Sequence, residues 1–71
     1  MIVNANKILS KRELNVLALV AAGFTSEQIG ASLAITKSTV QTHRRNMLRK
    51  TGFNNTLQLV GWGYREKVLK R

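Results

Sequence analysis

The sequence predicts an all-α domain: four short helices in a bundle-like arrangement around a central helix-turn-helix, a tetra-helical helix-turn-helix fold. Apolar residues recur at helical spacing in several segments, and no segment shows the alternation typical of a strand. Helix-start signals occur at Ser10 and Thr25, each followed three residues later by Glu or Gln. With 71 residues, the chain has room for one small domain.

The first helix is expected at about 11–22. Ser10 and Glu13 form the Ser-x-x-Glu pattern of a capping box, which satisfies two backbone N–H groups at a helix start. Residues spaced i, i+3, i+4 and i+7 give this helix one apolar stripe: Leu14, Leu17, Ala18 and Ala21. Residues 1–8 lack a clear period, so we expect a flexible N-terminal arm there and a domain at 9–71.

A second helix and a tight turn follow. Thr25 and Gln28 repeat the capping pattern, and the helix should reach about Leu33. Gly30 lies in its middle, where glycine costs about 1 kcal/mol relative to alanine. That cost is explained if another part of the backbone crosses closely at this point. Residues 34–36 are then long enough only for a tight turn.

The third helix is expected at about 37–50, with Thr36 as its N-cap and Gly52 as its stop. At 100° per residue, one side suits a core and the other suits water or a ligand. The inner side holds Val40, Arg44, Met47 and Thr51, with His43 at its margin. The outer side holds Ser38, Gln41, Thr42, Arg45 and Arg49.

A fourth helix should begin at Asn55, with an apolar stripe made by Leu57, Val60, Tyr64 and Val68 or Leu69. Gly61 and Gly63 weaken this helix, so it is expected to fray after Tyr64. Apolar residues lie on more than one of its sides, and a domain this small has trouble burying all of them. We therefore predict a dimer interface formed by Leu57, Val60, Trp62 and Tyr64.

Charge narrows the class of partner. The chain has twelve lysines and arginines against three acidic residues, a net charge of +9. This balance favours a polyanion: nucleic acid first, an anionic membrane surface second. There is no cysteine and one histidine, His43, and we find no catalytic constellation, metal site or cofactor motif. The sequence predicts a non-enzyme that needs no cofactor, and a bacterial cytoplasm is its expected location.

The outer side of the third helix suits DNA. Arg can pair with guanine O6 and N7, and Gln with adenine N6 and N7, so the Gln and Arg side chains of this face match base edges. A solvated face is the ordinary alternative, but this face has no acidic residue and follows a helix-turn-helix turn. The ends of the helix suit phosphate, and the predicted phosphate contacts are Thr36, Lys37, Ser38, Thr39, Arg49 and Lys50.

The segment from Leu9 to Gly52 resembles the LuxR-type (GerE-like) DNA-binding domain. The matching positions are Leu9, Ser10, Arg12, Glu13, Val16, Leu17, Gly23, Thr25, Ile29, Leu33, Ile35, Thr36, Thr39, Val40, His43, Asn46, Lys50 and Gly52. Departures fall at Asn15, Gln28, Gly30 and Thr51, where the family pattern has Glu, Glu, Ala and Leu. These departures concern packing more than DNA binding.

The resemblance implies a bacterial transcriptional regulator that binds double-stranded DNA, with the third helix in the major groove. It implies base contacts at Gln41, Thr42 and Arg45, phosphate contacts at Thr36, Thr39 and Lys50, and a homodimer formed on DNA through the fourth helix. Family members usually carry a receiver or ligand-sensing domain ahead of this one. The chain is therefore expected to be either an excised output domain or a natural single-domain regulator.

Two other functions stay open. The chain could be a truncated partner that modulates a full-length regulator or RNA polymerase through protein–protein contact. It could also be a cationic helical protein that binds membrane surfaces. Glycine and threonine helix stops and a globular core pattern favour DNA binding over the membrane alternative, and no membrane partner is predicted.

Overall fold

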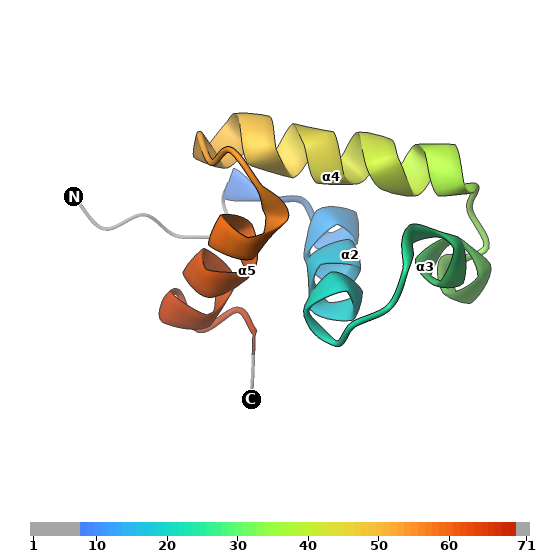
Figure 1. Ribbon diagram of the computed structural model, residues 1–71, viewed down its shortest axis with the longest axis horizontal. Helices are drawn as coiled ribbons and strands as arrows, with labels where there is room; N and C mark the ends of the chain where they lie inside the picture. Colours follow the sequence, from blue (N-terminus) through green and yellow to red (C-terminus); the bar gives the residue numbers. More distant parts are fainter. Residues whose placement is uncertain (1–7, 70–71) are drawn as a thin grey trace.

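The computed structural model describes residues 8–69, and these form four helices and no strand. The helices are α2 (Lys11–Ala21), α3 (Ser26–Leu33), α4 (Lys37–Thr51) and α5 (Thr56–Arg65). α4 runs along one side of the molecule, and α3 and α5 lie beneath it on either side of α2 (Figure 1). The predicted all-α, four-helix class is confirmed.

The helix starts are fixed by local capping, as predicted. Ser10 Oγ accepts from the backbone N–H of Glu13 at 3.1 Å, and the Glu13 carboxylate accepts from the backbone N–H of Ser10 at 2.8 Å. Thr25 and Gln28 form the same reciprocal pair at 3.2 and 2.9 Å. The backbone N–H of Thr39 donates to the Thr36 hydroxyl at 3.1 Å. These bonds satisfy first-turn N–H groups that have no helical carbonyl as a partner. Each of these three helices therefore begins directly after its N-cap residue.

The core is built from one side of each helix and from the residues just before α2. Its buried hydrophobic members are Leu9, Val16, Leu17, Ile29, Val40, Met47, Leu59, Trp62 and Leu69. Ile8 also packs against this cluster, so the packed domain includes the last residue of the predicted 1–8 arm. The rest of that predicted arm, residues 1–7, lies outside the described residues.

The turn between α3 and α4 crosses directly over Gly30. A Cβ atom added there would lie 2.7 Å from the carbonyl oxygen of Ile35, too close for two such atoms. The backbone N–H of Ile35 donates to the Gly30 carbonyl at 2.9 Å, and Ala34 adopts a left-handed conformation with φ of 58°. The predicted close crossing is confirmed, and this crossing sets the start of α4 against α3.

α5 packs against the core with Leu59 and Trp62, which the predicted apolar stripe did not include, as well as with Val60 and Tyr64 from that stripe. Leu59 and Trp62 point inward, and Trp62 packs edge-on against Phe53 with ring centroids 6.3 Å apart. Leu57, at the start of the predicted stripe, is 81% exposed. A helix buries the side that packs against its neighbours. In α5 this side carries Trp62 and packs against α2 and α4.

The C-terminal segment also differs from expectation. α5 ends at Arg65, close to the point where fraying was predicted, but the chain then folds back on the helix. The backbone N–H groups of Val68 and Leu69 donate to the Gly63 carbonyl at 3.0 and 3.2 Å. Gly63 has no side chain, which leaves room for Leu69 to enter the core.

Candidate nucleic-acid interface

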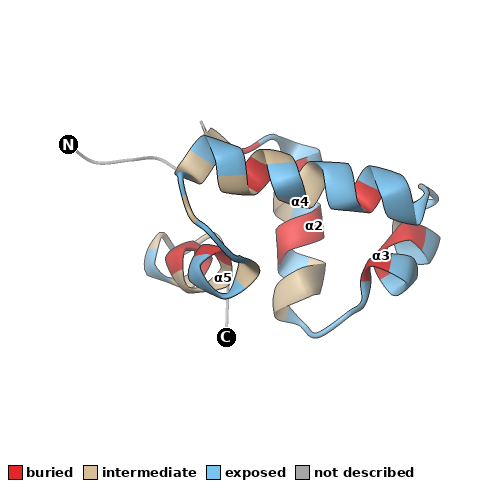
Figure 2. Cartoon of the chain, turned by 45° about the horizontal axis from the view of Figure 1, so that its top comes forward, coloured by how far each residue is buried: buried red, intermediate tan, exposed pale blue. Residues whose placement is uncertain are grey.

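The two sides of α4 face as the helical spacing predicted. Val40 and Met47 are buried at 0% and 1% exposure. The side chains on the opposite side are exposed: Ser38, Gln41, Thr42, Arg45 and Arg49. Figure 2 shows this long exposed surface of α4, broken by buried bands where the helix meets the core. A ligand can therefore reach this side of α4 from Ser38 to Arg49.

The three predicted base contacts lie together on one stretch of this surface. Within residues 8–69, neither Gln41 nor Arg45 forms a hydrogen bond or an ion pair, so their donors and acceptors face solvent unpaired. The Thr42 hydroxyl donates to the Ser38 carbonyl at 3.1 Å, one turn back along the helix. Its oxygen lone pairs and methyl group stay available for an outside partner.

The N-terminal end of α4 gathers four of the predicted phosphate contacts. The hydroxyls of Thr36 and Thr39 lie 2.9 Å apart, beside the backbone N–H groups of the first turn. Lys37 Nζ lies 3.4 Å from a Glu27 carboxylate oxygen, and both side chains are more than half exposed. Ser38 is exposed. Such a weak, solvated ion pair leaves the lysine able to turn toward an anion.

The C-terminal end of α4 carries the other two predicted phosphate contacts, Arg49 and Lys50, which have different hydrogen-bond partners. Arg49 is exposed and donates to the Asn46 side chain at 3.1 Å. Lys50 Nζ lies 2.7 Å from the Glu13 carboxylate, which is 4% exposed against 40% for the lysine side chain. Lys50 therefore already has an anionic partner inside the domain. Any phosphate that approaches it must share the ammonium group with Glu13.

The Glu13 carboxylate is held in its charged form. Burial by itself raises the pKa of this carboxyl, but the hydrogen bonds from Lys50 and from the Ser10 backbone N–H outweigh burial, with the charge of Lys50 adding to them. The pKa of Glu13 is consequently below its ordinary value. One carboxylate thus caps α2 and anchors the last turn of α4.

An open groove runs between α4 and the start of α5. It is lined by Gln41, Arg44, Arg45, Leu48 and Thr56. The Arg44 guanidinium lies within it and donates to the Ser26 hydroxyl at 2.9 Å and the Thr56 hydroxyl at 3.1 Å. Sequence reasoning did not identify Leu48 or Thr56, because nothing in a linear pattern shows that the start of α5 lies beside α4.

Negative charge is kept away from the outer side of α4. Glu13 is buried and pairs with Lys50. Glu27 lies on α3 and pairs with Lys37. Glu66 lies at the end of α5. These are all the acidic residues of the chain. The face that carries Gln41 and Arg45 therefore has no acidic residue and gains positive charge from Arg45 and Arg49, which suits a polyanion.

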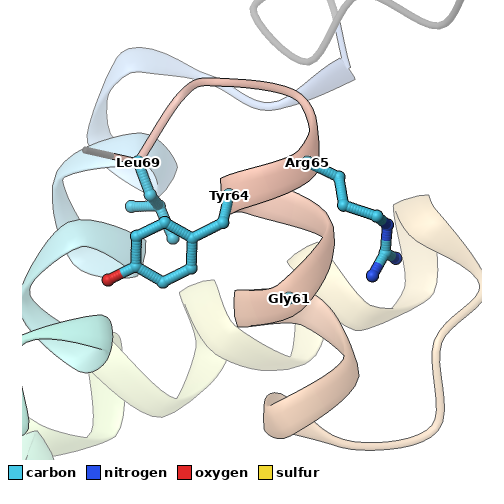
Figure 3. Close-up of a pocket in the computed structure, with 4 residues that line it drawn as sticks. All are labelled: Gly61, Tyr64, Arg65 and Leu69. Atoms are coloured by element: carbon cyan, nitrogen blue, oxygen red, sulfur yellow. The ribbon is translucent and has the colours of Figure 1, made fainter. Parts of the chain in front are cut away.

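The predicted dimer residues on α5 separate into two groups. Trp62 is 9% exposed and packs in the core, so it offers little surface to a second copy. Leu57 is exposed, and Val60 and Tyr64 are half-buried. Figure 3 shows the four residues that line a hollow at the C-terminal half of α5: Gly61, Tyr64, Arg65 and Leu69.

Comparison with known proteins decides the family. Residues 7–62 match the family described as bacterial regulatory proteins of the luxR family. The chain belongs to this family. It is thus a helix-turn-helix domain of the DNA-binding, transcription-regulating class.

Similar proteins include the oxygen regulatory protein NreC of Staphylococcus aureus. In strains JH9 and JH1 it is 36% identical to this chain over 64 residues, which is 90% of the chain and 30% of NreC. The chain therefore spans about a third of the length of the curated relatives that it matches.

Residues 8–69 hold no cluster of three or more histidine, cysteine or acidic side chains that could bind a metal ion. Over the same part of the chain, no helix has the length and apolar character needed to cross a bilayer.

Proposed function

We propose that this domain binds double-stranded DNA at specific sites, with α4 in the major groove, and regulates bacterial transcription from the cytoplasm. One observation carries the proposal: the exposed side of α4 presents Gln41 and Arg45, which have no partner within the described residues, on a face without acidic residues. Forked amide and guanidinium groups match the edges of adenine and guanine. A helix-turn-helix presents this side of its second helix to the major groove.

The contacts divide by chemistry. Gln41, Thr42 and Arg45 contact base edges and provide sequence preference, since they sit mid-helix where α4 would lie deepest in the groove. The residues at the two ends contact phosphates and provide affinity: Thr36, Lys37, Ser38, Thr39, Arg49 and Lys50. Lys50 contributes less than Arg49, because Glu13 already offsets part of its charge.

The test begins with selection of bound duplexes from a random pool. Arg45→Ala should then lower affinity by roughly 1–3 kcal/mol and relax preference at one base position. Arg49→Ala should weaken selected and random duplexes alike and make the log–log salt slope shallower by about 0.9. Lys50→Ala should act in the same way but less strongly. If Arg45→Ala and Arg49→Ala weakened both duplexes equally, the proposed division of roles would be wrong.

We propose further that the domain forms a homodimer on DNA through α5. The surface would consist of Leu57, Val60 and Tyr64 around Gly61, with Trp62 supporting it from the core. Selected sites should then be palindromic, with half-site centres about 10 base pairs apart. Leu57→Ser should reduce cooperative binding to the palindrome and leave binding to one half-site unchanged, as measured by titration of the two duplexes.

The alternative is a partner that modulates a larger regulator or RNA polymerase without binding DNA itself. It predicts that the chain alone selects no duplex and co-purifies with a larger regulator. No contact or exposed surface in residues 8–69 favours it over DNA binding, so the duplex selection decides between the two.

A further inference from the structure

Arg44 links three helices through one side chain. Its guanidinium projects from the middle of α4 and donates to the Ser26 hydroxyl, in the first turn of α3, at 2.9 Å. It also donates to the Thr56 hydroxyl, in the first turn of α5, at 3.1 Å. α3 and α5 lie on opposite sides of α2 (Figure 1). The two bonds therefore tie α4 to both sides of the domain at once.

The chemistry of this link is directional rather than ionic. Both partners are neutral hydroxyls, and Arg44 forms no ion pair within the described residues. A planar guanidinium donates along fixed directions, so two bonds to different helices restrict the rotation of α4 as well as its distance. Ser26 is 7% exposed, so its hydroxyl serves this contact inside the domain.

The position of the link matters because of its neighbours. Arg44 shares its groove with Gln41 and Arg45, the two forked side chains that α4 presents outward. Hydrogen bonds to base edges lose most of their strength when distance or angle departs from a narrow range. Attraction to phosphates depends far less on direction. A small rotation of α4 would therefore weaken base contacts before it weakened phosphate contacts.

We infer that Arg44 is a positioning residue for DNA sequence preference: through Ser26 and Thr56 it sets the angle at which α4 presents Gln41 and Arg45. The inference rests on the proposed DNA binding. It assigns to a half-buried arginine, which contacts no base, control over how well the domain distinguishes one duplex from another.

The experiment compares affinities for a selected duplex and a scrambled duplex of equal length across salt concentrations. Arg44→Lys keeps the charge but replaces the planar fork with an ammonium group that cannot hold both hydroxyls in the same geometry. Ser26→Ala removes one partner, and Ser32→Ala, an exposed serine in the same helix, is the matched control. Circular dichroism melts fix a temperature at which each variant is folded, and Ser26→Ala carries the test if Arg44→Lys does not fold.

The expected result is a loss of discrimination. Arg44→Lys should weaken binding to the selected duplex on the order of tenfold, and Ser26→Ala severalfold, with the scrambled duplex and the salt slope unchanged. Ser32→Ala should leave both affinities as they are. An unchanged ratio of the two affinities in the folded variants would overturn the inference.

A second arm separates positioning from direct phosphate contact. Arg44→Gln removes the charge; if it weakens both duplexes equally and makes the salt slope shallower by about 0.9, Arg44 contacts phosphate and the inference is wrong. The outcomes also separate the inference from the proposed function. A wild-type chain that prefers no duplex refutes the proposed DNA readout itself, whereas a wild-type preference that the variants keep refutes only the role of Arg44.

Discussion

The inner and outer sides of α4 differ in burial and in hydrogen bonding: the inner side is packed in the core, and the outer side is exposed. On the inner side, Val40 and Met47 are packed in the core and are almost completely buried. On the outer side, Gln41 and Arg45 have no partner within the described residues. Inner residues are satisfied by folding alone, whereas outer residues keep their hydrogen-bonding capacity for a molecule outside the chain.

This difference indicates that stability and recognition are largely separable on one helix. Substitutions on the inner side should change the free energy of unfolding, and substitutions on the outer side should change binding. The border residues Arg44 and Lys50 are exceptions, because each contacts the rest of the domain and also lies beside the proposed DNA-facing surface. Substitutions at these two residues can change both stability and binding.

The largest expected effect is on the inner side. Met47→Ala removes a side chain that is 1% exposed and leaves a cavity, which should lower the free energy of unfolding by about 2–5 kcal/mol. For a domain this small, that is a large share of the total stability. Gln41→Ala, on the other side of the same helix, should change stability by less than about 0.5 kcal/mol. Urea denaturation followed by circular dichroism measures both.

The same pair tests the separation in binding. Gln41→Ala should lower affinity for a selected duplex, whereas Met47→Ala, studied at a temperature where it is still folded, should retain it. Similar losses of stability in the two variants would show that the outer side of α4 also supports the fold.

A smaller effect is expected at the border, where Glu13 meets Lys50. Glu13→Gln keeps an oxygen for the Ser10 N–H group but loses the charge, which should lower stability near neutral pH by roughly 1–2 kcal/mol, since Lys50 is partly solvated. Because the folded-state pKa of Glu13 is below its ordinary value of 4.5, the folded state binds fewer protons than the unfolded state at pH values between the folded-state pKa and 4.5. This stabilisation is therefore fully present above pH 4.5 and is lost as pH falls through the folded-state pKa.

The measurement is the free energy of unfolding of wild type and variant from pH 7 to pH 3. The gap between them should close on acidification. Glu27→Gln is the matched control, because the Glu27–Lys37 pair is exposed and should contribute little at any pH. A gap for Glu13→Gln that stays constant with pH would mean that the carboxylate charge contributes nothing to stability.

What the sequence could predict follows from the range of the interactions. The caps at Ser10, Thr25 and Thr36 join residues three apart, so a linear pattern reveals them. The outward direction of Gln41 and Arg45 follows from helical periodicity in the same way. Both were predicted and both are confirmed.

The remaining features depend on contacts between distant segments. Lys50 and Glu13 are 37 residues apart, and the Arg44 bonds span 18 and 12 residues. Nothing in either local pattern marks those partners. The inward turn of Trp62 likewise depends on where α5 docks, because its apolar residues lie on several sides. Gly30 is intermediate: its unfavourable helix propensity indicated a close crossing, but only the fold shows that Ile35 is what crosses it.

The smallest expected effects are at Gly30 and Gly61. They test whether the close crossing of the turn over Gly30 fixes the position of α4. Both are glycines inside helices, and a methyl group at an unhindered site should stabilise by about 0.5–1 kcal/mol. Among residues 8–69, the only atom that the new Cβ at Gly61 would meet is at the flexible end of Arg65, at 3.4 Å, so Gly61→Ala should show that gain. At Gly30 it would meet the Ile35 carbonyl oxygen at 2.7 Å, so Gly30→Ala should show no gain or a loss of similar size.

Because the family pattern has alanine at the place of Gly30, we expect the turn to shift rather than the domain to unfold. That shift would move Thr36 and Lys37 at the start of α4, so Gly30→Ala should also weaken DNA binding slightly at the phosphate contacts there. Thermal melts and duplex titrations of the two variants measure these effects. Equal stabilisation by both substitutions would show that the crossing is loose in solution and that the turn does not fix the position of α4.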